Sequence, residues 1–410
     1  VIEEGYGQPV EAGLEAEARH IANVFGGEVQ RNLLRVFFWT EEVKKETGVA
    51  DPAVKPREVR KLGVLGAGLM GGGIAQLGAD KGLPVRMKDI DPGALAHGFA
   101  AAAAIWKEAV AKRRMKTGEM ERKMTLLSGT LEYTGFARCE VTIEAVVEKL
   151  SVKQSVLADW EAVVPDSAIF ASNTSTLPIT QIAERARHPR RVVGMHFFNP
   201  VAVLPLVELV RTPHTDDATL ATTWAFAERL RKRPVLVADA PAFVVNRLLT
   251  RLMGVFLDAL EHGTTTDEAD EAILRLGLPM APSVLLQMVG PRVANSVLET
   301  LHEAYPDRFL LSQTLANYAD GRDEIAVREH NARSRDEILV ATLEALADEV
   351  RHLLEEGVVA EAKDVDTALL LGAGFPFSLG GITKHLDQTG ISERIVGRPL
   401  AEIGAGAPTA

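Results

Sequence analysis

The stretch richest in residues that could take part in catalysis lies between residues 172 and 208, at and after the ends of two predicted strands. Ser172–Ser175 (Ser-Asn-Thr-Ser) follow the first strand, His196 ends the second, and Glu208 comes twelve residues after His196. A neutral histidine at the end of a strand can accept a proton as a general base. A carboxylate that returns to it would hold one ring N–H and stabilise the imidazolium that forms. A histidine followed by a glutamate is a weak pattern, so a purely structural role for both residues stays open at this point.

A glycine-rich turn near residue 66 forms a second candidate site. Gly66, Gly68 and Gly71 have the spacing G-x-G-x-x-G and follow the apolar run Leu62–Leu65. Gly66 permits a tight turn after a strand, Gly68 allows a pyrophosphate to approach the backbone, and Gly71 lets the next helix lie close to the sheet. The free N–H groups at the N-terminus of that helix would face the phosphates of a dinucleotide. Glycine-rich turns are common, so the alternative is a purely structural turn.

The second predicted strand of this unit ends at an acidic residue. Asp89 follows the run 84–87 and lies eighteen residues after Gly71. A carboxylate there accepts hydrogen bonds from ribose hydroxyls and repels a 2′-phosphate, which predicts NAD rather than NADP. Arg86 and Lys88 are close in sequence, but the alternation of a strand places both on the face opposite Met87. We therefore do not expect them to reach the ribose.

The elements that must position these residues alternate between strand and helix over residues 58–240. Such alternation predicts a Rossmann-type, doubly wound and mostly parallel sheet with helices on both faces. One of the expected helices is alanine-rich and covers 92–116. After Pro241 the pattern becomes helical, beginning with one long helix over 242–262. Residues 259–290 resemble residues 353–390, which predicts a duplicated all-α C-terminal domain, with chance similarity between helical segments as the alternative.

The first 57 residues do not resemble the start of a domain, and the chain begins at Val1 without a methionine. Residues 13–25 and 29–45 are expected to form amphipathic helices. Their apolar patch is expected to dock on a neighbouring or missing domain; it consists of Leu34, Val36, Phe37, Phe38 and Trp39. The expected domains are docking helices and linker at 1–57, a dinucleotide-binding domain at 58–240, and helical repeats at 241–320 and 321–410.

Composition narrows the possible functions. The net charge of −11 argues against nonspecific binding to nucleic acids. No apolar run approaches the roughly 20 residues of a membrane span, and the sequence does not address contact with a membrane surface. The single cysteine, Cys139, precedes a predicted strand and is interpreted as structural. It fits a reducing compartment, which predicts a cytoplasmic protein. No metal centre is expected.

Several longer motifs carry a resemblance to a known family. They are GAGLMGGGIA, KDID, IEAVVEKLSVK, FASNTSTLPI, GMHFFNPV, LVELV and FVVNRLL. In this order and spacing they resemble the 3-hydroxyacyl-CoA dehydrogenase family. More narrowly, residues from about 10 to about 390 resemble the dehydrogenase half of the multifunctional α-subunit of bacterial fatty-acid oxidation complexes.

The resemblance assigns roles to individual residues. His196 corresponds to the family's catalytic base and Glu208 to its acidic partner, whereas Ser175 and Asn246 correspond to polar residues at the reacting oxygen. The positions that correspond to cofactor contacts are Met70, Asp89, Glu148, Lys153 and Asn199. Structural alternatives remain for three of these residues. Ser175 would cap a helix near Pro178, Asn246 would satisfy backbone groups within the helical domain, and Lys153 would be a solvated helix charge.

The resemblance also implies an activity and partners. The implied reaction is NAD-dependent oxidation of (S)-3-hydroxyacyl-CoA to 3-ketoacyl-CoA in fatty-acid β-oxidation. The implied partners are an N-terminal enoyl-CoA hydratase domain in the same polypeptide and a thiolase β-subunit, so this chain alone is expected to lack hydratase activity. The alternatives are a free-standing 3-hydroxybutyryl-CoA dehydrogenase and a dinucleotide-binding protein without catalysis.

Two features concern the substrate side. The basic residues that end the alanine-rich helix, Lys112 among them, would either meet the phosphates of coenzyme A or form a solvated helix end. The first helical repeat also departs from the family pattern at Ala281, Gln287 and Arg292. These departures affect the expected shape of the surface that binds the acyl group, and they leave the expected reaction unchanged.

Overall fold

The computed structural model describes residues 1–404 and contains a central sheet in the order β3-β2-β1-β4-β5-β6-β7-β8. All neighbouring pairs are parallel except β6 and β7, which are antiparallel. This confirms the predicted doubly wound, mostly parallel sheet. The strands are β1 Leu62–Leu65, β2 Val85–Lys88, β3 Leu127–Thr130, β4 Val141–Glu144, β5 Ile169–Ser172, β6 Val192–Phe197, β7 Leu206–Arg211 and β8 Arg233–Ala238.

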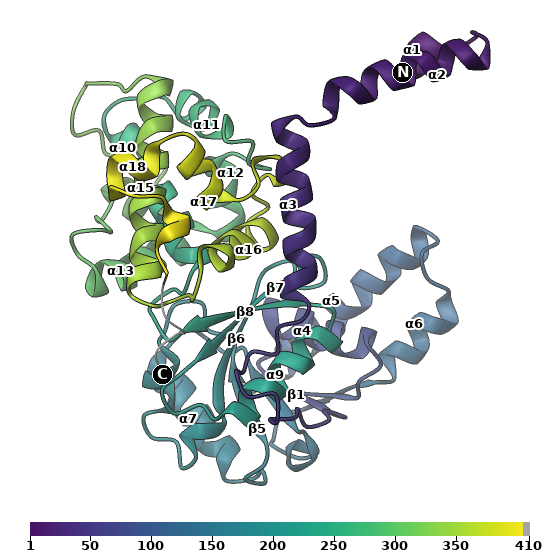
Figure 1. The fold of residues 1–410 in the computed structure, drawn as a ribbon. Coiled ribbons are helices and arrows are strands. Elements are labelled where there is room, and N and C mark those ends of the chain that lie inside the picture. The colour runs from purple at the N-terminus through teal and green to yellow at the C-terminus, as the bar shows by residue number, and fades with distance from the viewer. Residues whose placement is uncertain (405–410) are drawn as a thin grey trace.

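Helices connect the strands and cover the sheet in the lower part of Figure 1. The central strands β1, β4, β5 and β6 are buried along their whole length, as expected for strands with both faces covered. The helical connections are α4 Leu69–Asp80, α5 Pro92–Ala111, α6 Thr117–Met124, η1 Phe136–Arg138, α7 Leu150–Glu161, α8 Ile179–Ala183, η2 Pro189–Arg191 and α9 Asp217–Arg229.

Two details of this region differ from the sequence prediction. The alanine-rich helix was expected to reach residue 116, but α5 ends at Ala111, and Arg113 has a positive φ of 56°. The basic residues therefore lie in a turn between α5 and α6. The short edge strand β3 was not predicted, because its sequence Leu-Ser-Gly-Thr lacks an apolar alternation. Cys139 is buried, which raises the pKa of its thiol to about 11, in agreement with a structural role.

The second half of the chain is helical and packs above the sheet (Figure 1). Its elements are α10 Val245–Glu261, α11 Thr266–Leu274, α12 Pro282–Val289, α13 Pro291–Ala304, α14 Gln313–Ala319, α15 Arg335–Glu355, α16 Ala362–Gly372, η3 Phe377–Leu379, α17 Ile382–Gln388, α18 Ile391–Val396 and η4 Leu400–Glu402. The long helix predicted from residue 242 begins only at Val245. A turn precedes it, in which Ala242 and Phe243 have positive φ values of 58° and 52°.

The N-terminal segment contains α1 Ile2–Gly5, α2 Val10–Val24 and α3 Glu28–Val43. Figure 1 shows α1 and α2 projecting from the rest of the molecule, whereas α3 runs along the helical part. Val36 and Trp39 of α3 are buried, and Asn32 Nδ2 donates a hydrogen bond to the carbonyl of Ser378 at 2.9 Å. The predicted docking of the apolar patch thus holds for Val36 and Trp39. Its other members are exposed, namely Leu34, Phe37 and Phe38.

Residues 1–404 include no helix that is both long enough and apolar enough to cross a bilayer.

Candidate active site

The predicted site residues gather at the carboxyl edge of the sheet. The strands β1, β4, β5 and β6 are neighbours and run parallel, so their carboxyl ends meet along one edge. The glycine turn follows β1, Glu144 ends β4, Ser172 ends β5, and His196 lies near the end of β6. In doubly wound sheets this edge binds ligands, at the point where the strand order reverses. Here the order reverses between β1 and β4.

His196 and Glu208 form a buried pair. They lie directly opposite each other in the antiparallel β6–β7 ladder, and His196 Nδ1 is 2.7 Å from Glu208 Oε2. The residues are 5% and 0% exposed. Because Nδ1 is engaged by the carboxylate, Nε2 is the ring nitrogen left to exchange a proton. Within the described chain, Nε2 makes no hydrogen bond.

The second carboxylate oxygen of Glu208 joins the sheet to the helical region. Glu208 Oε1 accepts hydrogen bonds from the backbone N–H groups of Val244 and Val245, at 3.2 and 3.0 Å. These groups are at the start of α10, where helix N–H donors lack partners within the helix. The left-handed residues Ala242 and Phe243 form the turn that leads to them. We infer that this rarely populated backbone conformation orients both N–H groups toward the Glu208 carboxylate.

Two aromatic rings enclose His196. The ring of Phe198 is 4.4 Å from the imidazole centroid, and the ring of Phe243 is 5.7 Å away. Apolar neighbours lower the local dielectric and strengthen the His196–Glu208 interaction. The sequence analysis did not assign these residues to the site, although both lie within motifs that it quoted, GMHFFNPV and FVVNRLL.

Ser175 and Asn246 are brought together from different parts of the chain. Asn246 Nδ2 donates a hydrogen bond to the backbone carbonyl of Ser175 at 3.1 Å, so Asn246 does not serve backbone groups of the helical region alone. Ser175 does not cap α8 either. Asp239 occupies that role and accepts from the N–H groups of Ile179 and Thr180, both at 2.7 Å. Within residues 1–404 the Ser175 hydroxyl makes no hydrogen bond and is left available to a ligand.

An ion network lies beneath the loop that carries Ser175. Glu148 Oε1 accepts hydrogen bonds from the backbone of Ser175 at 3.0 Å and from the hydroxyl of Thr174 at 2.5 Å. Lys153 Nζ lies 3.0 Å from Glu148 Oε2 and 2.8 Å from Glu144 Oε1. Lys153 is 1% exposed, so it is not a solvated helix charge. Glu148 and Lys153 therefore hold the site loop in place.

The pKa values in this network follow from its charges. Burial alone would raise the pKa of Glu148, but the Lys153 ammonium and the hydrogen bonds from Thr174 and Ser175 lower it below its ordinary value. Burial alone would lower the pKa of Lys153, but Glu144 and Glu148 raise it. Both groups are thus held in their charged forms. The sequence analysis did not assign Glu144 to the site. A glutamate at the end of an apolar strand is visible in the sequence, but the residues that pair with it are not.

The glycine turn has the shape that a dinucleotide requires. Gly66 has φ of 96°, and a Cβ there would lie 2.4 Å from the carbonyl oxygen of Ala145. A Cβ at Gly71 would lie 1.9 Å from the carbonyl oxygen of Gly66. By contrast, a Cβ at Gly68 would meet no atom within 4 Å, so the backbone faces open space there. No side chain caps the N-terminus of α4, which leaves its N–H groups free for phosphates.

Asp89 and its neighbours agree with the predicted cofactor choice. Asp89 Oδ2 accepts a hydrogen bond from the N–H of Ala67 in the glycine turn at 2.8 Å. Arg86 donates to the carbonyl oxygens of Thr134 and Gly129, and Lys88 lies over the ring of Tyr133 at 4.6 Å. Both cations are thus already engaged by neighbouring groups of the protein. The residues present fit NAD.

The remaining predicted residues are placed as follows. Met70 is half-buried in the first turn of α4, and Asn199 is exposed shortly after β6. Lys112 follows α5, is exposed, and pairs with Glu108 at 2.5 Å. The structure therefore puts Met70 and Asn199 at the carboxyl edge of the sheet. It shows Lys112 in an ion pair at the helix end.

Fold and site together define a Rossmann-type dehydrogenase that uses NAD. Family models match residues 61–240, as the 3-hydroxyacyl-CoA dehydrogenase NAD-binding domain, and residues 243–322, as the 3-hydroxyacyl-CoA dehydrogenase C-terminal domain. The chain belongs to the 3-hydroxyacyl-CoA dehydrogenase family.

Individual relatives agree with this assignment. The fatty acid oxidation complex subunit alpha of Idiomarina loihiensis is 37% identical over 97% of this chain and 60% of the relative. The chain thus spans about three fifths of the length of such relatives. A crystal structure of (S)-3-hydroxybutyryl-CoA dehydrogenase from Ralstonia eutropha is 32% identical, with a TM-score of 0.62, over 64% of this chain and 94% of that chain. The dehydrogenase part of multifunctional enzyme 1 from C. elegans is 22% identical and covers 92% of this chain and 97% of that chain. Its TM-score of 0.55 shows a likeness of fold.

Proposed function

We propose that this chain oxidises the 3-hydroxyl group of (S)-3-hydroxyacyl-CoA to a ketone in fatty-acid β-oxidation. The observation that supports the proposal most is the buried His196–Glu208 pair at the sheet edge that also carries the glycine turn. A proton acceptor and a dinucleotide site on neighbouring strand ends are what alcohol oxidation requires.

We assign the following roles to the residues of the site. His196 Nε2 takes the hydroxyl proton, and Glu208 stabilises the imidazolium that results. The Ser175 hydroxyl and the Asn246 amide donate hydrogen bonds to the substrate oxygen as it becomes a carbonyl. When bound, NAD⁺ supplies the acceptor for the hydride that leaves C3. Glu148 and Lys153 keep the Ser175 loop in position, next to cofactor contacts that we assign to Met70, Asp89 and Asn199.

The test is the reverse reaction, followed by the absorbance of NADH with acetoacetyl-CoA as substrate. We expect steady NADH consumption that depends on the thioester. A folded protein that binds NADH but reduces neither acetoacetyl-CoA nor a longer 3-ketoacyl-CoA would contradict the proposal and support a binding protein without this activity. Lys112 is proposed to contact the phosphates of coenzyme A, which a higher KM for Lys112→Ala at unchanged kcat would support.

We further propose that the native protein is an α-subunit of a fatty-acid oxidation complex, located in the cytoplasm. It would contain an enoyl-CoA hydratase domain before this chain and associate with a thiolase β-subunit. The proposal rests on the identity to proteins of that name, which extend beyond the matched region. The mass of the natural protein, measured together with any subunit that copurifies, tests it. Hydration of crotonyl-CoA by these 410 residues alone would contradict it.

We also propose that residues 241–320 and 321–410 are repeats, docked beside the domain 58–240, with 1–57 as docking helices. Two hydrogen-bonded clamps support duplication. Asp270 accepts from both the backbone N–H and the hydroxyl of Ser283, and Asp366 accepts from the same two groups of Thr383. Each clamp ties the middle of one helix, α11 or α16, to the start of the helix that follows the proline loop, α12 or α17.

A reciprocal contact supports a two-fold relation between the repeats. A Cβ on Gly277 would lie 3.0 Å from Pro376, and a Cβ on Gly374 would lie 3.0 Å from Pro279. Each repeat thus contributes a glycine and a proline to the contact, and such a reciprocal contact is characteristic of a two-fold interface. Here it occurs within one chain.

A further inference from the structure

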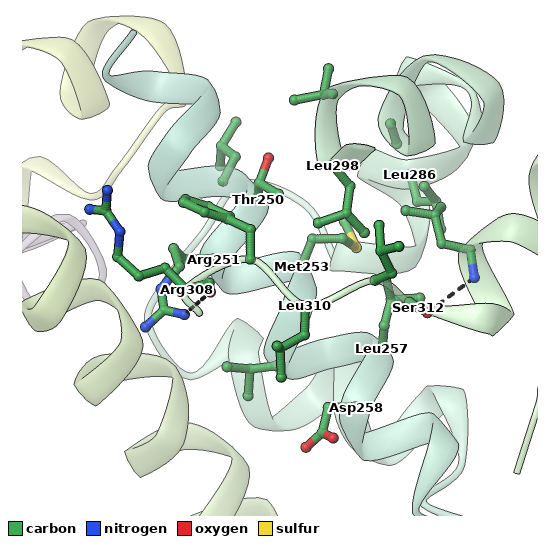
Figure 2. Close-up of a pocket in the computed structure, with 18 of the residues that line it drawn as sticks. Thr250, Arg251, Met253, Leu257, Asp258, Leu286, Leu298, Arg308, Leu310 and Ser312 are labelled. Atoms are coloured by element: carbon green, nitrogen blue, oxygen red, sulfur yellow. Dashed lines mark hydrogen bonds between the residues drawn. The ribbon is translucent and has the colours of Figure 1, made fainter. Parts of the chain in front are cut away.

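A pocket of about 350 Å³ opens in the helical region next to the candidate active site. Its walls are α10, α12, α13 and the segment 307–315. Figure 2 shows Met253, Leu257, Leu286, Leu298 and Leu310 gathered around it, with Arg251 and Arg308 to one side. The lining is mainly apolar, which favours an apolar occupant.

The pocket runs along α10, away from the reacting atoms. Its wall on this helix includes Asn246, Thr250, Met253 and Leu257, which recur at helical spacing and lie on one face. Asn246 also donates to Ser175, so one end of the pocket belongs to the site described above. A rise of 1.5 Å per residue places Leu257 about 16 Å beyond Asn246.

Three polar residues of the lining, Arg251, Arg328 and Ser312, already pair with the protein. Arg251 lies 3.1 Å from Asp348, and Arg328 lies 2.7 Å from Glu261. Ser312 donates to Glu261 at 2.7 Å. A ligand in the pocket therefore meets few groups that require a hydrogen bond. An unsubstituted hydrocarbon chain fits such a lining, because it gains from leaving water and has no polar group to satisfy.

We propose that this pocket holds the acyl chain of the substrate and that the enzyme favours medium and long chains over acetoacetyl-CoA. The inference rests on the proposed function, because the thioester must be bound with its 3-oxygen at His196, Ser175 and Asn246. An extended hydrocarbon advances about 1.25 Å per carbon, so 16 Å accommodates roughly a dozen carbons. Met253 gives the wall a flexible side chain that adapts to chains of different length.

A larger side chain in place of Gly254 is expected to shorten the pocket. It lies in the middle of α10, lines the pocket, and a Cβ at this position would meet no atom within 4 Å. A large side chain can therefore enter the pocket without a clash with its walls at Cβ. Replacement of a helical glycine also favours the helix, so the fold is expected to persist.

The experiment measures kcat/KM for reduction of 3-ketoacyl-CoA of four and twelve carbons in four proteins: wild type, Gly254→Ala, Gly254→Phe and Gly13→Phe. Gly13 is also a helical glycine whose Cβ would meet no atom within 4 Å, and it lies in α2, outside the pocket. In wild type we expect the twelve-carbon substrate to be preferred, since each buried methylene contributes roughly fourfold. In Gly254→Phe the twelve-to-four ratio should fall at least about tenfold, because two or more methylenes are excluded. Gly254→Ala and Gly13→Phe should retain the wild-type ratio.

Inhibition supplies a second measure that does not need turnover of the long substrate. Dodecanoyl-CoA should inhibit acetoacetyl-CoA reduction more strongly than butyryl-CoA, and Gly254→Phe should remove most of this difference. Equal ratios in wild type and Gly254→Phe, with acetoacetyl-CoA still reduced, would overturn the pocket assignment and leave the proposed function intact. Absence of turnover with any chain length in folded wild type would instead contradict the proposed function itself.

Discussion

His196 and Glu208 are twelve residues apart in the chain but directly opposite in the sheet, with Nδ1 and Oε2 separated by 2.7 Å. Only an antiparallel pairing of β6 with β7 gives this register, in a sheet that is otherwise parallel. Residues that face each other across neighbouring strands project their side chains to the same side. The pair is therefore fixed by backbone hydrogen bonds and not by flexible side chains alone.

Removal of the base should affect turnover and leave cofactor binding nearly intact. His196→Gln should lower kcat by at least roughly 10²-fold, since general-base catalysis contributes about 10² to 10⁴. NADH affinity should change little, because the glycine turn lies on a different strand. Glu208→Gln should show a loss of the same kind, and the double variant should be little worse than the worse single one. Turnover, NADH affinity and melting temperature are measured on the same three proteins.

The competing view of this pair is that both residues are only structural. In that case both single variants should melt at lower temperature, with residual activity that follows the folded fraction. A folded, NADH-binding His196→Gln protein with near-normal turnover would remove His196 from the mechanism.

Asp89 should make the enzyme selective for NADH over NADPH. Its carboxylate is placed to accept from ribose hydroxyls and to repel a 2′-phosphate. Asp89→Asn removes the charge but keeps an acceptor, so we expect roughly 10-fold weaker NADH binding, as for loss of a charged hydrogen-bond partner. The NADPH-to-NADH ratio of kcat/KM should rise. Comparable efficiency with both cofactors in the wild-type protein would contradict the assignment of this site.

Lys153 should be important for stability as well as for the Ser175 loop. It is 1% exposed and neutralises the fully buried Glu144. Lys153→Met leaves that carboxylate without its cation, which typically costs about 3 to 5 kcal/mol of unfolding free energy. Lys149→Met, at an exposed position before the same helix, is the control and should change stability little. Urea denaturation of the three proteins measures the difference, and equal midpoints for both variants would show that the network is dispensable.

Asp366 should give the helical region a distinct pH dependence. Complete burial raises the pKa of Asp366 to about 7, although hydrogen bonds from Thr383 lower it in part. Between its ordinary value near 4 and pH 7, the folded protein holds a proton that the unfolded chain has lost. The stability from this group is therefore complete below about pH 4 and is lost as pH rises through 7.

The variant Asp366→Asn isolates this effect, since it has nearly the same shape and cannot ionise. Its unfolding free energy relative to wild type should increase between pH 5 and pH 8. Denaturation curves at the two values give the difference directly. A relative stability that is constant, or that falls with pH, would show that Asp366 stays charged in the folded protein.

The sequence by itself determined the dinucleotide unit. Gly66, Gly71 and Asp89 are linked by local rules, because a turn, a helix start and a strand end each depend on a few adjacent residues. The strand–helix alternation that predicted the sheet is equally local. Family resemblance added the individual roles of Ser175 and Asn246, whose types alone do not reveal them.

Only the tertiary structure decided how distant segments meet. The antiparallel β7 places Glu208 against His196, and the left-handed turn at Ala242 and Phe243 aims the start of α10 at the same carboxylate. The pairing of Lys153 with Glu144 depends likewise on packing between elements. Such contacts are set by the burial of whole faces and by the paths of connections between them, which leave no fixed spacing in the sequence. For the same reason the pocket beside Asn246 could not be predicted from the sequence, because its walls come from helices that approach each other only in the folded chain.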